Sequence, residues 1–448
     1  MPSRFSHFVR RAASERNNVI KFFVITIDLA LVVVSYIIAF LARFSGNLPE
    51  NNINPFFAAL PLVVLSFLIY ADIFGLLKFY RKSRRQIIAS IFKLVFMQTL
   101  TTTTVAYFMQ GFSFPRSVLL GAAAIQAALL SIWNWIMLSL REHYAQTSDA
   151  LIIGEKEYAS VLTDKLADYI KGEKIRIKYI FTPSEKAKYM NIIKKSQADE
   201  IFLCGGLSED LKMEILLLCM DLRKVVYLVP EVFEIALLNA RIIHFDDVPL
   251  IFMDRLSLSF EQRLFKRAFD IALTLAALPL MLPFLLAVAL GVKLTSPGRV
   301  LYSQERVTSG GHIYKIYKFR TMYEDAERLT GPVISYENDE RVTSFGKFLR
   351  RYHIDEIPQL INVIIGDMSL VGPRSERPYF VEQFSRDIDG YTIRNNVKAG
   401  LTGYAQIFGN YDTKAEIKLK YDILYIKNYS LLLDVKLILQ TFNTIFRK

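Results

Sequence analysis

The chain has 448 residues, of which 52% are hydrophobic, and a formal net charge of +12. It is too long for one ordinary core, so two or three structural units are expected, and its apolar content points to membrane insertion. Lys and Arg outnumber Asp and Glu by 55 to 43, which beside membrane segments favours anionic lipid or phosphate-bearing substrates over nucleic acid. Cys204 and Cys219 lie in no CxxC pattern and have no His near them at metal-ligand spacing, so neither a disulfide framework nor a zinc site is indicated.

Four apolar stretches are each long enough to span hydrocarbon, which takes roughly 20 residues. They cover residues 19–43, 55–78, 87–110 and 115–140, and predict a four-helix transmembrane domain over 1–145. The N-terminal tail and the loop YRKSRRQ are rich in Arg and Lys, whereas GNLPENNIN and GFSFP have none. The positive-inside rule therefore puts the tail, the basic loop and everything after about residue 140 in the cytoplasm.

Residues 146–255 alternate between strand-like and helix-like segments, which is typical of an α/β module. The predicted strands are DALIIG, IRIKYIF, DEIFLCGG and KVVYLVP. After the first strand only Gly154 of a G-x-G-x-x-G loop is present, and Glu155 and Glu157 would repel a phosphate. We expect a Rossmann-like cytoplasmic module with a degraded nucleotide-binding loop, used for docking or regulation.

The segment KRAFDIALTLAALPLMLPFLLAVALGVKLTSPGR could cross a bilayer, but Pro279 and Pro283 lie near its middle. Each proline removes a backbone donor and clashes with the carbonyl four residues earlier, so a sharp break is expected. Cations flank both ends, which places both ends on the cytoplasmic face. They are Lys266, Arg267, Lys293 and Arg299. A re-entrant helix over 266–293 satisfies both observations, and a kinked fifth spanning helix is the alternative.

The stretch KIYKFRTM alternates cations with apolar residues. At the period-2 spacing of a strand, Lys318 and Arg320 share a face and Lys315 does not. Lys318 and Arg320 are therefore candidates to converge on one anionic ligand, with a solvated strand edge as the alternative.

Asp355 and Glu356 form an acidic pair in the segment RRYHIDEIPQLINVIIGDM. A run with helical spacing follows as far as Gly366, and Pro358 suits a first helical turn, so Asp355 is predicted to cap the N-terminus of this helix. A helix N-terminus also attracts phosphate and keeps a nearby carboxylate ionised, as a nucleophile or metal ligand requires. The neighbouring His353 is expected to be structural rather than a general base.

Arginines surround this acidic pair in the sequence. Two precede it and two follow a Gly-Pro turn, and arginine holds diphosphates through bidentate hydrogen bonds. They are Arg350, Arg351, Arg374 and Arg377. With Mg²⁺, such a set suits displacement at phosphorus, whereas the absence of P-loop, H-E-x-x-H and G-x-S-x-G patterns argues against ATPases, zinc proteases and serine hydrolases. The tail after residue 414 has the composition of an interfacial helix.

These segments resemble the bacterial sugar transferase family, the polyprenyl-phosphate hexose-1-phosphate transferases. The resemblance covers about residues 260–448 and rests on KRAFDIALTLAALPLMLP, KIYKFRTM, IDEIPQLINVIIGDMSLVGPR, VKAGLTGYAQI and YDILYIKNYSLLLDVKLIL. The N-terminal helices and the α/β module resemble the long form of the family, which initiates exopolysaccharide, capsule or O-antigen synthesis. An α-rich catalytic domain over 256–448 is implied, anchored by the re-entrant helix in the bacterial inner membrane and facing the cytoplasm.

The resemblance implies a two-step reaction. Asp355 attacks the β-phosphate of a UDP-sugar, UMP leaves, and undecaprenyl phosphate then takes the sugar phosphate from the aspartyl intermediate. Glu356 would hold Mg²⁺, Arg350 and Arg374 match phosphate-binding positions, and Asp422 matches a further functional acidic position. The departures from the family pattern spare the acidic pair; they are Leu282 before Pro283, Ser375, Ala399 and Tyr404.

The sequence leaves several functional questions open. An inactive membrane scaffold of polysaccharide export would need the membrane segments without the chemistry, and the intact acidic pair argues against it. An NAD-dependent nucleotide-sugar epimerase or dehydratase would rest on the α/β module alone, whose glycine loop is degraded. The transferred sugar, the ligand of the α/β module and the oligomeric state, a homodimer included, are not determined.

Overall fold

The computed structural model describes residues 3–46, 50–77, 84–108, 115–144, 148–163, 175–181, 186–323, 341–409 and 413–445, apart from residues 197, 199, 239 and 254. The chain divides into two compact units, Met1–Val229 and Pro230–Lys448. Each unit is described by itself.

The division falls earlier than residue 255, where the sequence pattern ends the α/β module. The reason is that α8 (Val232–Leu237) packs on α14 (Ala415–Lys427) of the second unit. Ile235 is buried in a cluster with residues of α14, and Lys420 Nζ lies 2.8 Å from Glu231 Oε2. Residues from 230 onward therefore contribute to the core of the second unit.

Four long helices open the first unit. They are α1 (Ser3–Arg43), α2 (Glu50–Ile73), α3 (Arg84–Phe108) and α4 (Arg116–Tyr144). Together with α9 of the second unit, they are the five helices among the described residues that are long and apolar enough to cross a membrane. Polar side chains in lipid need partners within the bundle. Gln126 accordingly donates to Gln98 Oε1 at 2.8 Å, and Asn134 donates to Asp28 Oδ1 at 3.0 Å. The basic loop over 78–83 lies outside the described residues.

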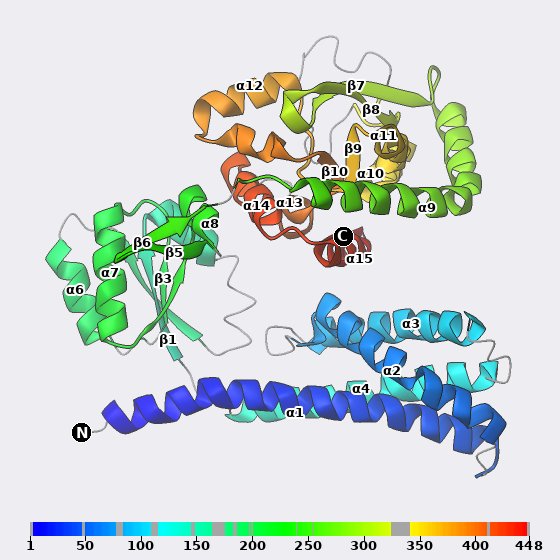
Figure 1. The fold of residues 1–448 in the computed structure, drawn as a ribbon, viewed down its shortest axis with the longest axis horizontal. Coiled ribbons are helices and arrows are strands. Elements are labelled where there is room, and N and C mark those ends of the chain that lie inside the picture. Colours follow the sequence, from blue (N-terminus) through cyan, green and yellow to red (C-terminus); the bar gives the residue numbers. More distant parts are fainter. Residues whose placement is uncertain are drawn as a thin grey trace. The chain divides into compact units, whose positions relative to one another are not determined.

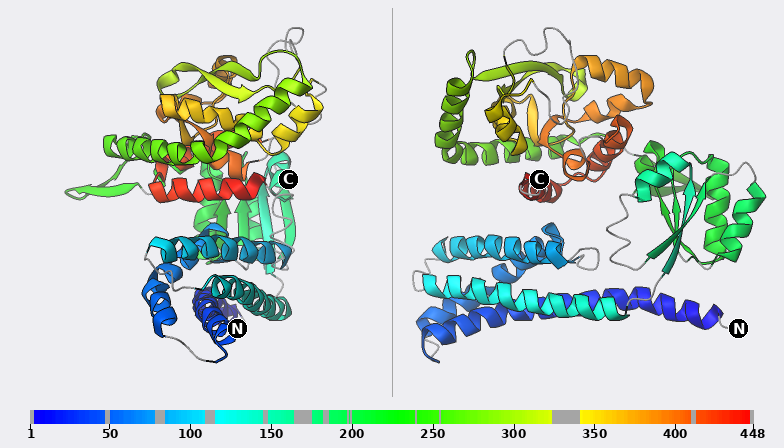
Figure 2. Two further views of the ribbon diagram at one scale, coloured as in Figure 1. Left: turned by 90° about the vertical axis from the view of Figure 1, so that its right-hand side faces the viewer. Right: turned by 180° about the vertical axis from the view of Figure 1, so that it is seen from behind.

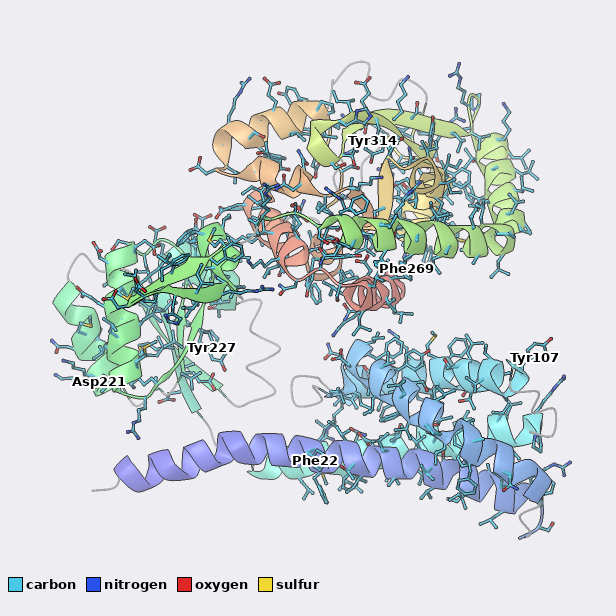
Figure 3. All side chains as sticks on the ribbon, viewed as in Figure 1. Phe22, Tyr107, Asp221, Tyr227, Phe269 and Tyr314 are labelled. Carbon is cyan, nitrogen blue, oxygen red and sulfur yellow. The ribbon has the colours of Figure 1, made fainter. Side chains whose placement is uncertain are left out.

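A parallel four-stranded sheet with the order β2-β1-β3-β4 follows in the first unit. Its strands are β1 (Ser148–Gly154), β2 (Ile175–Phe181), β3 (Glu200–Leu203) and β4 (Val225–Leu228), at the predicted places. Tyr227, labelled in Figure 3, stacks on Phe202 with ring centroids 4.6 Å apart. Glu155 lies against Gly206, where an added Cβ would meet the Glu155 Cδ at 2.4 Å. A carboxylate thus occupies the turn after β1, and the Rossmann-like assignment stays a prediction.

Helix α9 (Phe260–Thr295) opens the membrane-associated part of the second unit, and Pro279 and Pro283 lie inside it. Figures 1 and 2 show α9 as two arms joined at a sharp bend, with α10 (Ser344–Arg351), α11 (Leu360–Ile365) and β9 (Met368–Val371) lying within the angle between the arms. Strand β8 (Ile313–Phe319) precedes these three elements in the chain. Both arms contact the rest of the unit. The first packs on α11 and β9, whereas Val288 and Val292 of the second are buried against β8 and α10. The bend agrees with the break predicted from the two prolines.

Buried polar contacts fix the first arm of α9. Lys266 Nζ lies 2.6 Å from Asp434 Oδ2, and Asp270 Oδ2 accepts a hydrogen bond of 2.7 Å from the Ser369 hydroxyl. Arg267 donates to two main-chain carbonyls at the end of α11. The cations predicted to flank a membrane segment therefore also hold this segment to the folded unit.

The remaining described residues of the second unit are mostly helical and include three two-stranded sheets. The strands pair as β5 (Arg241–Phe245) with β6 (Val248–Phe252), β7 (Leu301–Val307) with β8 (Ile313–Phe319), and β9 (Met368–Val371) with β10 (Ala399–Thr402). The helices are α10 (Ser344–Arg351), α11 (Leu360–Ile365), α12 (Pro378–Asp387), α13 (Tyr404–Phe408) and α15 (Leu431–Ile445), and the short 3-10 helices include η3 (Ile354–Gln359) and η4 (Tyr391–Asn396). Tyr314 of β8, labelled in Figure 3, shares the main core with Val363, Tyr425 and Leu437. The tail thus contributes to the core, and its interfacial role stays a prediction.

Candidate active site

The acidic pair lies in the 3-10 helix η3, between α10 and α11. Asp355 is therefore not the N-cap predicted from the sequence: it sits in the first turn of η3, which is preceded by His353. His353 adopts a left-handed conformation, with φ 54° and ψ 23°, and reverses the chain after α10. The helix starts late because Pro358 disfavours α-helical geometry in the residue before it and has no N–H to donate.

Glu356 is held by two cations. Its Oε1 lies 2.6 Å from Lys318 Nζ and 2.7 Å from Arg374 Nη2, and its Oε2 accepts a hydrogen bond of 3.2 Å from Arg374 Nη1. Burial opposes the charge of Glu356, but Arg374 and Lys318 together hold its pKa well below the usual range. Glu356 is consequently an ionised anchor that fixes a lysine of β8 and the arginine of the Gly-Pro turn at one point.

Asp355 is buried beside this cluster, and its Oδ1 has no hydrogen-bond partner among the described residues. Burial and the neighbouring charge of Glu356 raise the pKa of Asp355, whereas Lys318, Arg350 and Arg374 lower it. Because no donor from the described part of the chain occupies Oδ1, its lone pairs can interact with an electrophile or a cation. Three nearby cations supply the charge that a phosphate group would need.

The site suits a magnesium ion only in part. No group of three His, Cys, Asp or Glu side chains able to share a metal occurs in the described ranges. Mg²⁺ often uses one or two carboxylates together with substrate phosphates, and the unpartnered Oδ1 of Asp355 fits such a ligand. Glu356, the predicted metal ligand, has both oxygens engaged and would have to exchange Lys318 or Arg374 for the ion.

Two of the predicted site residues, Arg320 and Asp422, make their contacts outside the cluster of Asp355 and Glu356. The guanidinium of Arg320 donates to the carbonyl and the hydroxyl of Ser296, both at 2.8 Å, at the end of α9. Because β8 ends at Phe319, the strand spacing used to group Lys318 with Arg320 does not extend to Arg320. Asp422 pairs with Arg394 at 2.9 Å, away from the contacts of Glu356. Arg350, in contrast, acts electrostatically on Asp355 and donates to the Thr321 hydroxyl at 2.8 Å.

The turn that carries Arg374 is fixed by close backbone packing. Gly372 N donates to Thr402 O and Gly400 N donates to Pro373 O, both at 2.8 Å. A Cβ on Gly400 would lie 2.0 Å from Gly372 N, so no other residue fits there without moving the main chain. Two further arginines that the sequence pattern did not indicate, the half-buried Arg306 and the buried Arg394, hold main-chain carbonyls of the same turn. Arg306 donates to Ser375 O at 3.0 Å.

The second unit is similar in sequence to proteins of a known family. The model of the family described as "Bacterial sugar transferase" matches residues 261–448. The chain is 45% identical to a UDP-N-acetylgalactosamine-undecaprenyl-phosphate N-acetylgalactosaminephosphotransferase of Aeromonas hydrophila, over 40% of this chain and 43% of the relative. It is 41% identical to a UDP-glucose:undecaprenyl-phosphate glucose-1-phosphate transferase of Escherichia coli (strain K12), over 50% of this chain and 48% of the relative.

A shorter relative is matched over nearly its whole length. The exopolysaccharide production protein PSS of Rhizobium leguminosarum bv. phaseoli is 39% identical over 184 residues, which are 39% of this chain and 92% of the relative. The chain spans about half the length of the two relatives named before it. Together these matches show that the chain belongs to the bacterial sugar transferase family.

Proposed function

We propose that this protein transfers a sugar 1-phosphate from a UDP-sugar to undecaprenyl phosphate, giving undecaprenyl-diphosphate-sugar and UMP. The observation that carries this proposal is the buried Oδ1 of Asp355, which has no hydrogen-bond partner among the described residues and lies near Lys318, Arg350 and Arg374. The printed names of the relatives support the same reaction class and the same lipid acceptor. The transfer would be the first membrane step of exopolysaccharide, capsule or O-antigen synthesis.

In the first step, a carboxylate oxygen of Asp355 forms a bond to the β-phosphorus of the UDP-sugar. The bond from that phosphorus to the bridging oxygen of UMP breaks, and UMP leaves with the electron pair. Burial and Glu356 raise the pKa of Asp355, and the charges of Lys318, Arg350 and Arg374 oppose this rise and favour the ionised form that the attack requires. Arg374 and Lys318 lie where they can balance charge on the diphosphate oxygens.

In the second step, an oxygen of undecaprenyl phosphate forms a bond to the same phosphorus, and Asp355 leaves as a carboxylate. The sugar phosphate is then part of the lipid diphosphate, and the enzyme is regenerated. Glu356 is the residue that would hold Mg²⁺, in exchange for Lys318 or Arg374, and the ion would supply further charge neutralisation when bound with the substrate phosphates.

We place the reaction at the cytoplasmic surface of a bacterial inner membrane. Cations flank both ends of α9, both of its arms contact the same unit, and its exposed side chains, such as Leu280, Leu286 and Leu290, are apolar. These observations support a re-entrant helix that enters and leaves the bilayer on one side. A lipid phosphate at headgroup level would then be within reach of the catalytic unit.

The decisive experiment compares sugar-phosphate transfer by the purified, reconstituted wild-type protein and by a variant in which Asp355 is replaced, both with Mg²⁺ present. Asp355→Asn should lower UMP release by about 1,000-fold or more, because it removes the nucleophile. Without lipid acceptor, the wild-type protein should gain one sugar phosphate on the peptide containing Asp355, measured by mass spectrometry. Asp389→Asn makes the same change on the exposed surface of the same unit and should leave transfer unchanged. Full turnover by Asp355→Asn would contradict the proposed nucleophile.

Transfer from a small panel of UDP-sugars into a lipid fraction would identify the sugar. If the wild-type protein transferred none of them, the alternative of an inactive scaffold in polysaccharide export would be favoured. NAD retained on purification would instead support the epimerase or dehydratase alternative.

A further inference from the structure

A second buried ion pair lies near the turn that carries Arg374. Arg394 of η4 and Asp422 of α14 are 5% and 1% exposed, and Arg394 Nη2 lies 2.9 Å from Asp422 Oδ2. The other terminal nitrogen, Nη1, donates to the Tyr391 hydroxyl at 2.5 Å. A buried guanidinium is tolerated only when a counter-ion and hydrogen-bond acceptors satisfy it, and Asp422 is the counter-ion here.

The same guanidinium also holds the main chain of the active-site turn. Arg394 Nη2 donates to the carbonyl oxygen of Arg374 at 2.7 Å. The side chain of Arg374 continues from that point to Glu356, with two contacts of 2.7 and 3.2 Å. A continuous series of contacts therefore runs from Asp422 through Arg394 and Arg374 to Glu356.

Direct chemistry by this pair is not supported by its contacts. Within the described part of the chain, Arg394 and Asp422 make no ion pair or hydrogen bond with Asp355, Glu356 or Lys318. Lys318 is carried by β8, and Arg350 is fixed by Thr321, so neither depends on Arg394. The effect of the pair on the site is thus confined to Arg374.

We propose that Arg394 is a positioning residue for Arg374, and that Asp422 serves the reaction by holding Arg394 in place. This inference rests on the proposed function, and it gives a physical role to Asp422 and to an arginine that the sequence analysis did not select. Asp422 fixes the guanidinium of Arg394, which fixes the carbonyl of Arg374. The side chain of Arg374 is thereby held in one orientation, in which it contacts Glu356 and can bind the substrate diphosphate.

The test is a double-mutant cycle between Asp422→Asn and Arg374→Ala, measured as kcat/KM of the full chain in reconstituted membranes. Misplacing a group by about 1 Å can cost up to about 100-fold, so Asp422→Asn should lower kcat/KM by about 10- to 100-fold. In the Arg374→Ala background the same change should cost no more than about twofold, because the group it positions is already gone.

The control for packing damage is Lys420→Gln. Lys420 lies on α14, the helix of Asp422, and the change breaks its 2.8 Å ion pair with Glu231. It should leave kcat/KM unchanged in both backgrounds. If Asp422→Asn does not fold, Tyr391→Phe removes only one acceptor of Arg394 and should give a smaller loss with the same dependence on Arg374. Equal losses with and without the Arg374 side chain would overturn this inference, since general destabilisation acts in both backgrounds. Absence of transfer by the wild-type protein would instead contradict the proposed function.

Discussion

The carboxylate of Glu356 has two cationic partners, so a metal ion at this residue has to compete with them. Removing one competitor should strengthen metal binding. We expect Lys318→Met to lower the dissociation constant of Mn²⁺ for the nucleotide-free protein several-fold, measured by electron paramagnetic resonance, although transfer activity falls. Lys315→Met alters an exposed lysine of the same strand and should change neither quantity. Unchanged or weaker Mn²⁺ binding in Lys318→Met would mean that Glu356 is not where the metal binds.

The left-handed residue before the acidic pair provides a second prediction. His353 has φ 54°, a conformation that costs a non-glycine residue about 1–2 kcal/mol and is worst for β-branched side chains. His353→Gly should therefore keep both the free energy of unfolding and the transfer rate, and His353→Val should lower the former by about 1–2 kcal/mol. Denaturant unfolding and UMP release measure the two effects. An equal loss of transfer in both variants would show that the imidazole itself is needed.

Of the four arginines that the sequence grouped with the acidic pair, the structure brings Arg350 and Arg374 near it, and the role of the group stays a prediction. The sequence did not indicate that Asp355 lies in a 3-10 helix, because helical spacing and a proline are equally compatible with a cap. It also missed Arg394, whose partner Asp422 is far along the chain. A contact between such distant positions leaves no local pattern in a single sequence.

Among the secondary-structure elements, the bend of α9 could be predicted from its two prolines alone. What the prolines could not supply is the packing of the second arm, where Phe345 of α10 lies so close to Gly291 that an added Cβ would be 2.8 Å from its ring. The division between the two compact units near residue 230 likewise depends on packing. The helix α8 is assigned to the second unit by its contacts with α14, not by its own composition.

The topology of α9 can be tested by chemical labelling. If the helix is re-entrant, a cysteine replacing the exposed Arg299 stays in the cytoplasm and should react with a membrane-impermeant maleimide only after permeabilisation. A cysteine replacing Asn47, in a loop that the charge rule places outside, should react in intact cells. The native Cys204 and Cys219 are buried and should give little background. Labelling at position 299 in intact cells would favour a fifth spanning helix.

For the whole molecule, the short relative from Rhizobium leguminosarum bv. phaseoli is informative, since its aligned part covers 92% of that protein and only 39% of this chain. The candidate site is built entirely from residues after 229. We therefore expect residues 230–448, expressed alone in membranes, to retain transfer within a few-fold of the full chain. The same short chain with Asp355→Asn is the control. Loss of activity in a folded, membrane-inserted short chain would show that the first unit contributes to the site.

The close approach of the main chains at Gly372 and Gly400 limits which substitutions this protein can accept. A Cβ on Gly400 would lie 2.0 Å from Gly372 N, and one on Gly372 would lie 2.4 Å from Lys398 O, so neither residue can acquire a side chain without displacing the main chain next to Arg374. In a saturation-mutagenesis library selected for polysaccharide production, both codons should tolerate almost no change. A change of sugar preference would accordingly have to come from substitutions at other positions around the site, while Gly372 and Gly400 stay unchanged.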